Sequence, residues 1–159
     1  VGAHGVHFDS VRYREQRTNY SAFEFEVQFA GILLLQAPDR QSEPDAGIAD
    51  HFLGVGGLAT EVAVRGEIAL QDSFIYQIAG KDAVAKMEEE GTTLQDGFRD
   101  LAQREKIACA PVRLDVGDMY FFKADNIHEV PAFGGETSRV VLATFIGWSE
   151  NDSRIFVWS

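Results

Sequence analysis

The chain has 159 residues, a net charge of −11 and no basic stripe. This charge disfavours binding to nucleic acids and to anionic membranes. Its single cysteine, Cys109, excludes an internal disulfide and a thiolate-cluster metal site. The length and the 45% apolar content predict one domain over 1–159, and with no membrane-length apolar run or signal peptide we expect a cytoplasmic protein.

The first motif in the chain is His7-Phe8-Asp9. In an extended segment, residues i and i+2 point to the same side, so His7 and Asp9 can converge on one metal ion while Phe8 faces a core. The other interpretation is a loop near the chain end with a surface histidine and a solvated acid. The pair alone does not decide between them.

The segment 21–36 predicts a long strand. Its first half alternates, with Phe25, Val27 and Phe29 on an apolar face and Gln28 on the polar face, and its second half is continuously apolar. Gln28 can contact a ligand, face solvent or pack on the sheet. Residues 37–47 have the composition of a loop, and 59–70 and 73–78 predict short strands.

Residues 81–106 change to a helical composition, with Gly91 as a stop and Thr92 or Thr93 as a cap. This insertion predicts either a lid over a cavity mouth or a surface hairpin.

Strand patterns return at 110–122, which has a turn at Gly117-Asp118, and at 127–133, 138–149 and 154–159. About eight short strands with inserted helices predict a mainly β fold, and a jelly roll is its natural eight-stranded form.

The segment 117–148 contains two further polar residues of interest. His128 opens a strand, and Arg139 stands inside the apolar strand 138–149. A buried arginine needs an anion, so Arg139 either faces an anionic ligand or pairs with an ordinary acid at the end of the strand.

Together, HxD at 7–9, G-D-x-x-x-F at 117–122, H-E-V at 128–130, a Gly turn and an arginine in a strand resemble the Fe(II)- and 2-oxoglutarate-dependent oxygenase superfamily. The likeness is greatest to its prolyl-hydroxylase-like branch and the bacterial small-molecule hydroxylases and halogenases. The resemblance implies a double-stranded β-helix, which is a jelly roll, and one Fe(II) held by His7, Asp9 and His128. It also implies that Arg139 binds the far carboxylate of 2-oxoglutarate, with Ser138 and Asn126 as further contacts.

By this resemblance, the protein hydroxylates an unactivated C–H bond of a small molecule and releases succinate and CO2. Related halogenases carry a small residue at the acid position, so Asp9 favours hydroxylation over halogenation. The alternative is a cupin-like domain that binds a metal or a small molecule without turnover. Arg139 argues for the oxygenase, because a cupin needs no clamp for a cosubstrate carboxylate. No motif specifies the substrate or the oligomeric state.

The family usually has helices and at least one strand before HxD, whereas six residues precede it here. The resemblance therefore predicts that the N-terminal part of the usual domain is short or missing. It also predicts that apolar sheet surface is exposed as a result.

Overall fold

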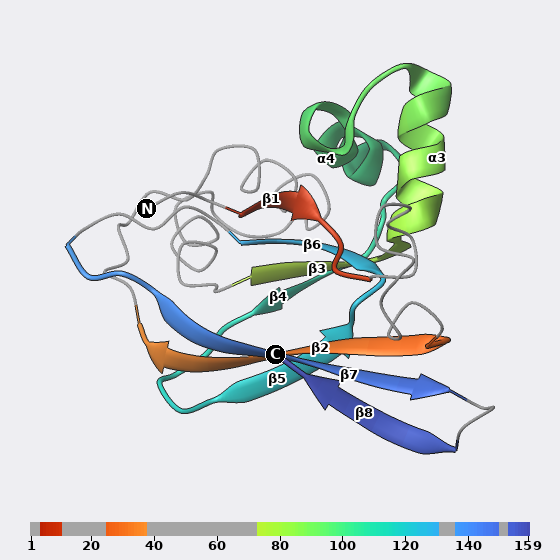
Figure 1. The fold of residues 1–159 in the computed structure, drawn as a ribbon. Helices are drawn as coiled ribbons and strands as arrows, with labels where there is room; N and C mark the ends of the chain where they lie inside the picture. The colour runs from red at the N-terminus through yellow and green to blue at the C-terminus, as the bar shows by residue number, and fades with distance from the viewer. Residues whose placement is uncertain (1–3, 11–24, 38–72, 131–135, 150–152) are drawn as a thin grey trace.

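The computed structural model describes residues 4–10, 25–37, 73–130, 136–149 and 153–159. Their strands form two antiparallel four-stranded sheets that face each other, with two helices beside the first sheet (Figure 1). The first sheet has the order β1 (His4–His7), β6 (Asn126–Val130), β3 (Ser73–Ala79) and β4 (Cys109–Val112). The second has the order β5 (Met119–Lys123), β2 (Val27–Gln36), β7 (Val140–Ser149) and β8 (Arg154–Trp158). This confirms the predicted mainly β architecture, while the strand expected over 59–70 lies outside the described residues.

The chain crosses from the first sheet to the second between β4 and β5. The sequence predicted one strand region with a turn at Gly117-Asp118, and the turn is present, with Gly117 at φ 97°. A residue with a Cβ is strained at this φ, so the glycine permits the chain to reverse here. The two halves of the predicted strand therefore belong to different sheets, as in a jelly roll.

Strand alternation gives the first sheet a different core on each face. On β6, Ile127 and Glu129 point toward the helices, and His128 points toward the second sheet, where its ring lies edge-on to Phe122 with centroids 4.6 Å apart. The core between the sheets contains Ala30, Phe122 and Ala124. Because successive side chains of a strand point to opposite faces, neighbouring residues of β6 serve two separate cores.

The predicted helical insertion consists of α3 (Gly80–Glu90) and α4 (Leu94–Arg104). Gly91 ends α3 with φ 69°, and the Thr93 side chain caps α4 by accepting a hydrogen bond from the Asp96 N–H, as the composition predicted. Their apolar sides pack on the outer face of the first sheet in a fully buried cluster that includes Ala83, Met87, Phe98, Leu101, Val6 and Ile127.

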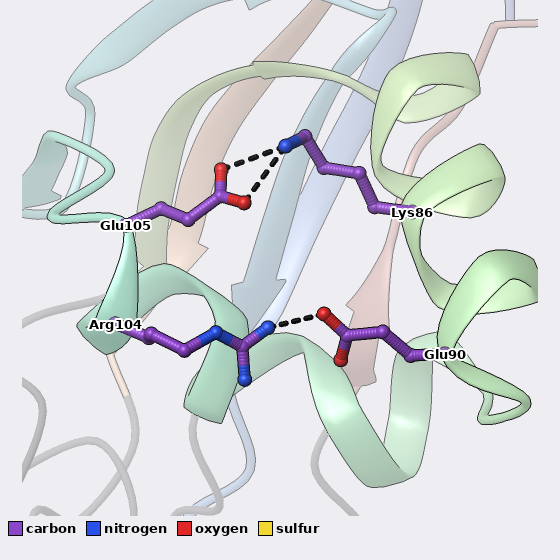
Figure 2. A network of polar contacts seen from close by, with 4 residues as sticks. All are labelled: Lys86, Glu90, Arg104 and Glu105. Carbon is purple, nitrogen blue, oxygen red and sulfur yellow. Dashed lines mark hydrogen bonds and ion pairs between the residues drawn. The ribbon is translucent and has the colours of Figure 1, made fainter.

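This packing favours the surface hairpin over the lid, the two alternatives that the sequence left open. The helical pair covers the face of the first sheet that points away from the core between the sheets (Figure 1). The helical pair is held there because its apolar side is buried against the apolar outer face of the first sheet. On the polar side of the pair, two ion pairs join α3 to α4, Lys86 with Glu105 and Glu90 with Arg104 (Figure 2).

The start of the long strand differs from its predicted alternation. Phe25 is buried and a bend at Glu26 precedes β2, after which Gln28 is buried and Phe29 is 39% exposed. The bend shifts the side-chain alternation, because one irregular residue reverses which face the following residues occupy. Gln28 therefore does not face solvent, and its Nε2 donates to the Phe25 carbonyl oxygen at 3.3 Å.

The outer face of the second sheet is apolar and open. The register of its strands places one set of large apolar side chains on the face away from the core, and several of them are exposed: Phe29, Phe121, Leu142, Trp148, Ile155 and Val157. The predicted exposure of apolar sheet surface is thus found on this face. Among the described residues, neither helix is long and apolar enough to cross a bilayer.

Candidate metal centre

The side chains of His7 and Asp9 meet that of His128, which is remote from them in the sequence, between the sheets. The His7 Nε2 atom lies 3.9 Å from Asp9 Oδ1, and the His128 Nε2 atom lies 3.4 Å from Asp9 Oδ2. One ligand atom from each residue lies within 4.8 Å of the others, and this is the group of three potential metal ligands found within the described ranges. The structure therefore brings together the three residues that the sequence singled out as ligands.

Strand pairing produces this convergence. His7 at the end of β1 is the register partner of His128 on β6, and their ring centroids are 4.1 Å apart. The pairing is irregular between His4 and His7, which turns His7 toward the core between the sheets. The main-chain N–H of Asp9 then donates to the carbonyl oxygen of Ala124 at 2.8 Å, which holds the acid beside both rings.

Main-chain hydrogen bonds fix the tautomer of both imidazoles. The His7 Nδ1 atom lies 2.6 Å from the Gly5 carbonyl oxygen, and the His128 Nδ1 atom lies 3.1 Å from that of Asn126. A carbonyl oxygen only accepts, so each Nδ1 carries the proton and each Nε2 keeps its lone pair. Both lone pairs are therefore available to a metal ion next to Asp9.

Burial keeps His7 in the uncharged form that a metal requires. Desolvation, followed by the nearby His128, lowers the pKa of His7 below its ordinary value of 6.5. The His128 side chain is 6% exposed, whereas those of His7 and Asp9 are 32% and 23% exposed. The group is thus closed on the His128 side and accessible from the other, as a centre that admits small molecules needs.

The donor set fits ferrous iron. Two neutral imidazoles and one carboxylate form the 2-His-1-carboxylate set of non-haem Fe(II) oxygenases, which leaves coordination positions open for other ligands. The carboxylate of Asp9 also balances part of the charge of a divalent ion, and the two hydrogen-bonded imidazoles are held in the orientation that the ion needs.

Of the three predicted cosubstrate residues, Asn126 lies on the first sheet, whereas Ser138 and Arg139 precede the first residue of β7 in place of standing inside the strand. Arg139 directly precedes β7 in the second sheet, and its Nε atom is buried although the residue as a whole is half-buried. Ser138 is exposed, and its carbonyl oxygen accepts from Gln36 Nε2 at 2.8 Å. Asn126 opens β6 and contacts His128 through its main-chain carbonyl group.

The sequence reasoning missed a buried carboxylate beside the candidate metal centre. Glu129, which follows His128, is 1% exposed and bonds to Tyr76 and Arg99. The signal was present in the strand pattern, because two consecutive polar residues within an apolar strand must point into opposite faces.

A family model described as the carrier-protein-independent halogenase WelO5 matches residues 66–159, more than half of the chain. The chain belongs to this family. With it the chain is a member of the Fe(II)- and 2-oxoglutarate-dependent oxygenase superfamily, which uses iron and 2-oxoglutarate, and this confirms the predicted resemblance. No curated protein matches the sequence significantly.

Solved structures share the fold. An N-substituted L-amino acid dioxygenase from Burkholderia ambifaria AMMD is 16% identical with a TM-score of 0.55, and the match covers 96% of this chain and 48% of that one. The same dioxygenase in complex with alpha-KG gives a TM-score of 0.52 at 16% identity, covering 97% and 51%. The chain therefore spans about half the length of these neighbours, and the likeness supports the jelly-roll fold.

Proposed function

We propose that this protein is an Fe(II)- and 2-oxoglutarate-dependent hydroxylase that oxidises an unactivated C–H bond of a small molecule and releases succinate and CO2. The convergence of His7, Asp9 and His128 carries the proposal, since these groups are the donors that non-haem ferrous iron takes. Bound iron supplies the activation of O2 that couples decarboxylation of 2-oxoglutarate to oxidation of the substrate.

The chain's own residues then have defined tasks. His7 and His128 present Nε2 to the metal and hold their rings through Nδ1, while Asp9 supplies the anionic ligand. Arg139 binds the distal carboxylate of 2-oxoglutarate, because a guanidinium can donate two parallel hydrogen bonds to one carboxylate. Ser138 and Asn126 contribute further polar contacts to the cosubstrate or to the three metal ligands.

Asp9 supports hydroxylation in place of halogenation. A halide can bind the metal only where a coordination position is free, and the Asp9 carboxylate lies 3.4 Å from His128 Nε2, where it takes that position. The match to the WelO5 family begins at residue 66 and does not include His7 or Asp9. Membership of that family is therefore compatible with an oxygenase that lacks halide chemistry.

The structural neighbours suggest a first set of substrates. Their dioxygenase acts on N-substituted L-amino acids, and molecules of this size suit a centre enclosed between two sheets. We propose a small molecule as substrate, with N-substituted amino acids as the first panel to be tested.

The direct test is succinate formation from 2-oxoglutarate under air, with Fe(II) and that panel. We expect succinate in excess of a metal-free control with wild type and none in excess with Asp9→Ala. His4→Ala is the matched control, because His4 is an exposed histidine on the same strand, its ring centroid is 5.9 Å from that of His7, and it does not belong to the ligand group.

Equal succinate from wild type and Asp9→Ala would refute the proposed centre. Tight metal binding at the three ligands without any succinate would instead favour the binding domain without turnover that the sequence left open.

A further inference from the structure

A buried carboxylate lies back to back with the metal ligand His128. Glu129 is the next residue of β6, points to the helical side of the first sheet and is 1% exposed. Its Oε1 accepts from the Tyr76 hydroxyl at 2.5 Å, and its Oε2 accepts from Arg99 Nε at 3.1 Å and Nη2 at 2.7 Å. Tyr76 of β3 and Arg99 of α4 therefore bind β6 at the residue next to the proposed metal ligand His128.

Stability alone does not account for this charge. Removing a carboxylate from water costs free energy, and a well-packed apolar side chain commonly stabilises such a site as well or better. The surroundings are suited to apolar packing, since Tyr76, the partner of Glu129, belongs to a fully buried cluster with Phe98 and Leu101. A network in which both carboxylate oxygens are bonded instead fixes the relative positions of β3, β6 and α4, because all of its hydrogen bonds form in only one arrangement of these elements.

The main-chain pairing around His128 explains why the position of β6 needs additional contacts. The pairing of β6 with β1 changes register between His4 and His7, and its pairing with β3 changes register between Ile75 and Ala79. His128 is opposite His7 on one side and Ile75 on the other, so it lies beside an irregularity in both neighbouring strands. Regular main-chain hydrogen bonds thus constrain β6 less here than elsewhere in the sheet.

We propose that Glu129, held by Arg99 and Tyr76, is a positioning residue that fixes β6 so that His128 Nε2 faces Asp9. The inference rests on the proposed function of the three ligands, and it couples the helical pair to the metal centre through Arg99 on α4. Removing the network lets β6 shift and rotates the His128 ring away from the other two ligands. Outer contacts that orient metal ligands typically change metal affinity by about 10–100-fold.

The test uses Co(II), whose visible spectrum reports its coordination, as a probe of the site in the whole chain. Glu129→Gln keeps the shape and removes the charge, and Tyr76→Phe removes one hydroxyl group from the network. We expect Glu129→Gln to weaken Co(II) binding by about 10–100-fold and Tyr76→Phe to weaken it less. Both variants should also alter the spectrum of bound Co(II). Circular dichroism of the metal-free proteins reports whether each variant is folded.

Glu90→Gln is the matched control. It breaks an ion pair with Arg104 that also involves α4, but on the exposed side of the helical pair (Figure 2). We expect its Co(II) affinity and spectrum to equal those of wild type. A merely stabilising role for Glu129 would move the melting temperature without changing the spectrum of bound Co(II), and that result would overturn the inference.

The outcomes separate this inference from the proposed function. Wild-type affinity and spectrum in folded Glu129→Gln would overturn the inference while leaving the three ligands in place. If Glu129→Gln does not fold, Tyr76→Phe decides in the same way, with an unchanged Co(II) site counting against the network. A wild-type protein that binds no Co(II), or binds it as well after Asp9→Ala, would overturn both proposals.

Discussion

The two sheets differ in what covers their outer faces. The first sheet has α3 and α4 on its outer face and the second sheet on its inner face, so residues of β6 such as Ile127 and Glu129 are 0% and 1% exposed. The second sheet shares the inner core, but Ile155 and Val157 on its outer face are 71% and 67% exposed. The strands that carry the proposed metal ligands His7 and His128 thus belong to the enclosed layer.

This difference has a physical consequence for the centre. A strand packed on both faces has less freedom to shift than a strand with one open face, because protein interiors are close-packed and resist changes of volume. His7 and His128 lie on strands of that layer, whereas Arg139 directly precedes β7 of the sheet with one open face. We therefore expect the first sheet to control metal affinity and the second sheet to control cosubstrate affinity.

The largest effect should separate these two tasks. His128→Ala removes a metal ligand, so we expect Co(II) binding to fall below detection by calorimetry. Arg139→Ala leaves all three ligands in place, so its Co(II) affinity should equal that of wild type while its 2-oxoglutarate affinity, measured with the metal-loaded protein, falls by at least about tenfold, the loss of a charge-assisted contact. Equal loss of metal binding in both variants would contradict the division between the sheets.

The next effect concerns the stability of the two outer faces. Phe98→Ala removes a fully buried ring between α4 and the first sheet, so it should lower the free energy of unfolding by about 3–5 kcal/mol. Phe121→Ala removes a ring that is 51% exposed on the second sheet, and the loss should stay within about 1 kcal/mol. Urea unfolding of both variants provides the comparison. A large loss for Phe121→Ala would mean that the open face is covered in solution.

The reactivity of Cys109 measures how well the helical pair shields the first sheet. Burial raises the pKa of this thiol on β4 from 9.0 to about 12, and the nearby Glu129 acts in the same direction. The thiolate is the reactive form, so alkylation by iodoacetamide should rise about tenfold per pH unit between pH 8 and pH 10. Mass spectrometry gives the rate, and a plateau near pH 9 would show that the thiol is not shielded.

The smallest effect should come from the ion pairs that join the two helices. Lys86 and Glu105 are 40% and 38% exposed, so solvent screens their attraction. Lys86→Ala should therefore lower the free energy of unfolding by less than about 1 kcal/mol, and high salt should remove most of the difference. A loss as large as that for Phe98→Ala would mean that polar contacts, and not the apolar cluster, hold the helical pair.

Much of the fold was predictable because the residues follow simple periodicities. Within the described residues, the strands predicted at 127–133 and 138–149 correspond to β6 and β7, and the helical composition of 81–106, with its Gly91 stop, corresponds to α3 and α4. The placement of the helices was not predictable, since strands buried on both faces do not show which face a helix covers. The burial of Gln28 was missed because a single bend at Glu26 reversed the alternation.

The candidate site was predictable to a similar extent. The pair of His7 and Asp9 did not decide by itself between a metal site and a surface loop, and the resemblance to the oxygenase superfamily added His128 as the third ligand. The structure brings these three residues together. Glu129 lay next to His128 in the sequence, but its partners Tyr76 and Arg99 come from other elements. Pairing between such distant residues depends on strand register and helix docking, which no local pattern specifies.

The sequence by itself determined the chemistry available to this protein, which is two imidazoles, a carboxylate and a guanidinium in or next to strands whose periodicity predicts a β-sheet core. Only the tertiary structure decided which of these groups meet and which layer encloses them. The physical reason is that side-chain type and strand period are local properties of the sequence. The side chains of His7, Asp9 and His128 can converge on one point only when strands from opposite ends of the chain pair with each other.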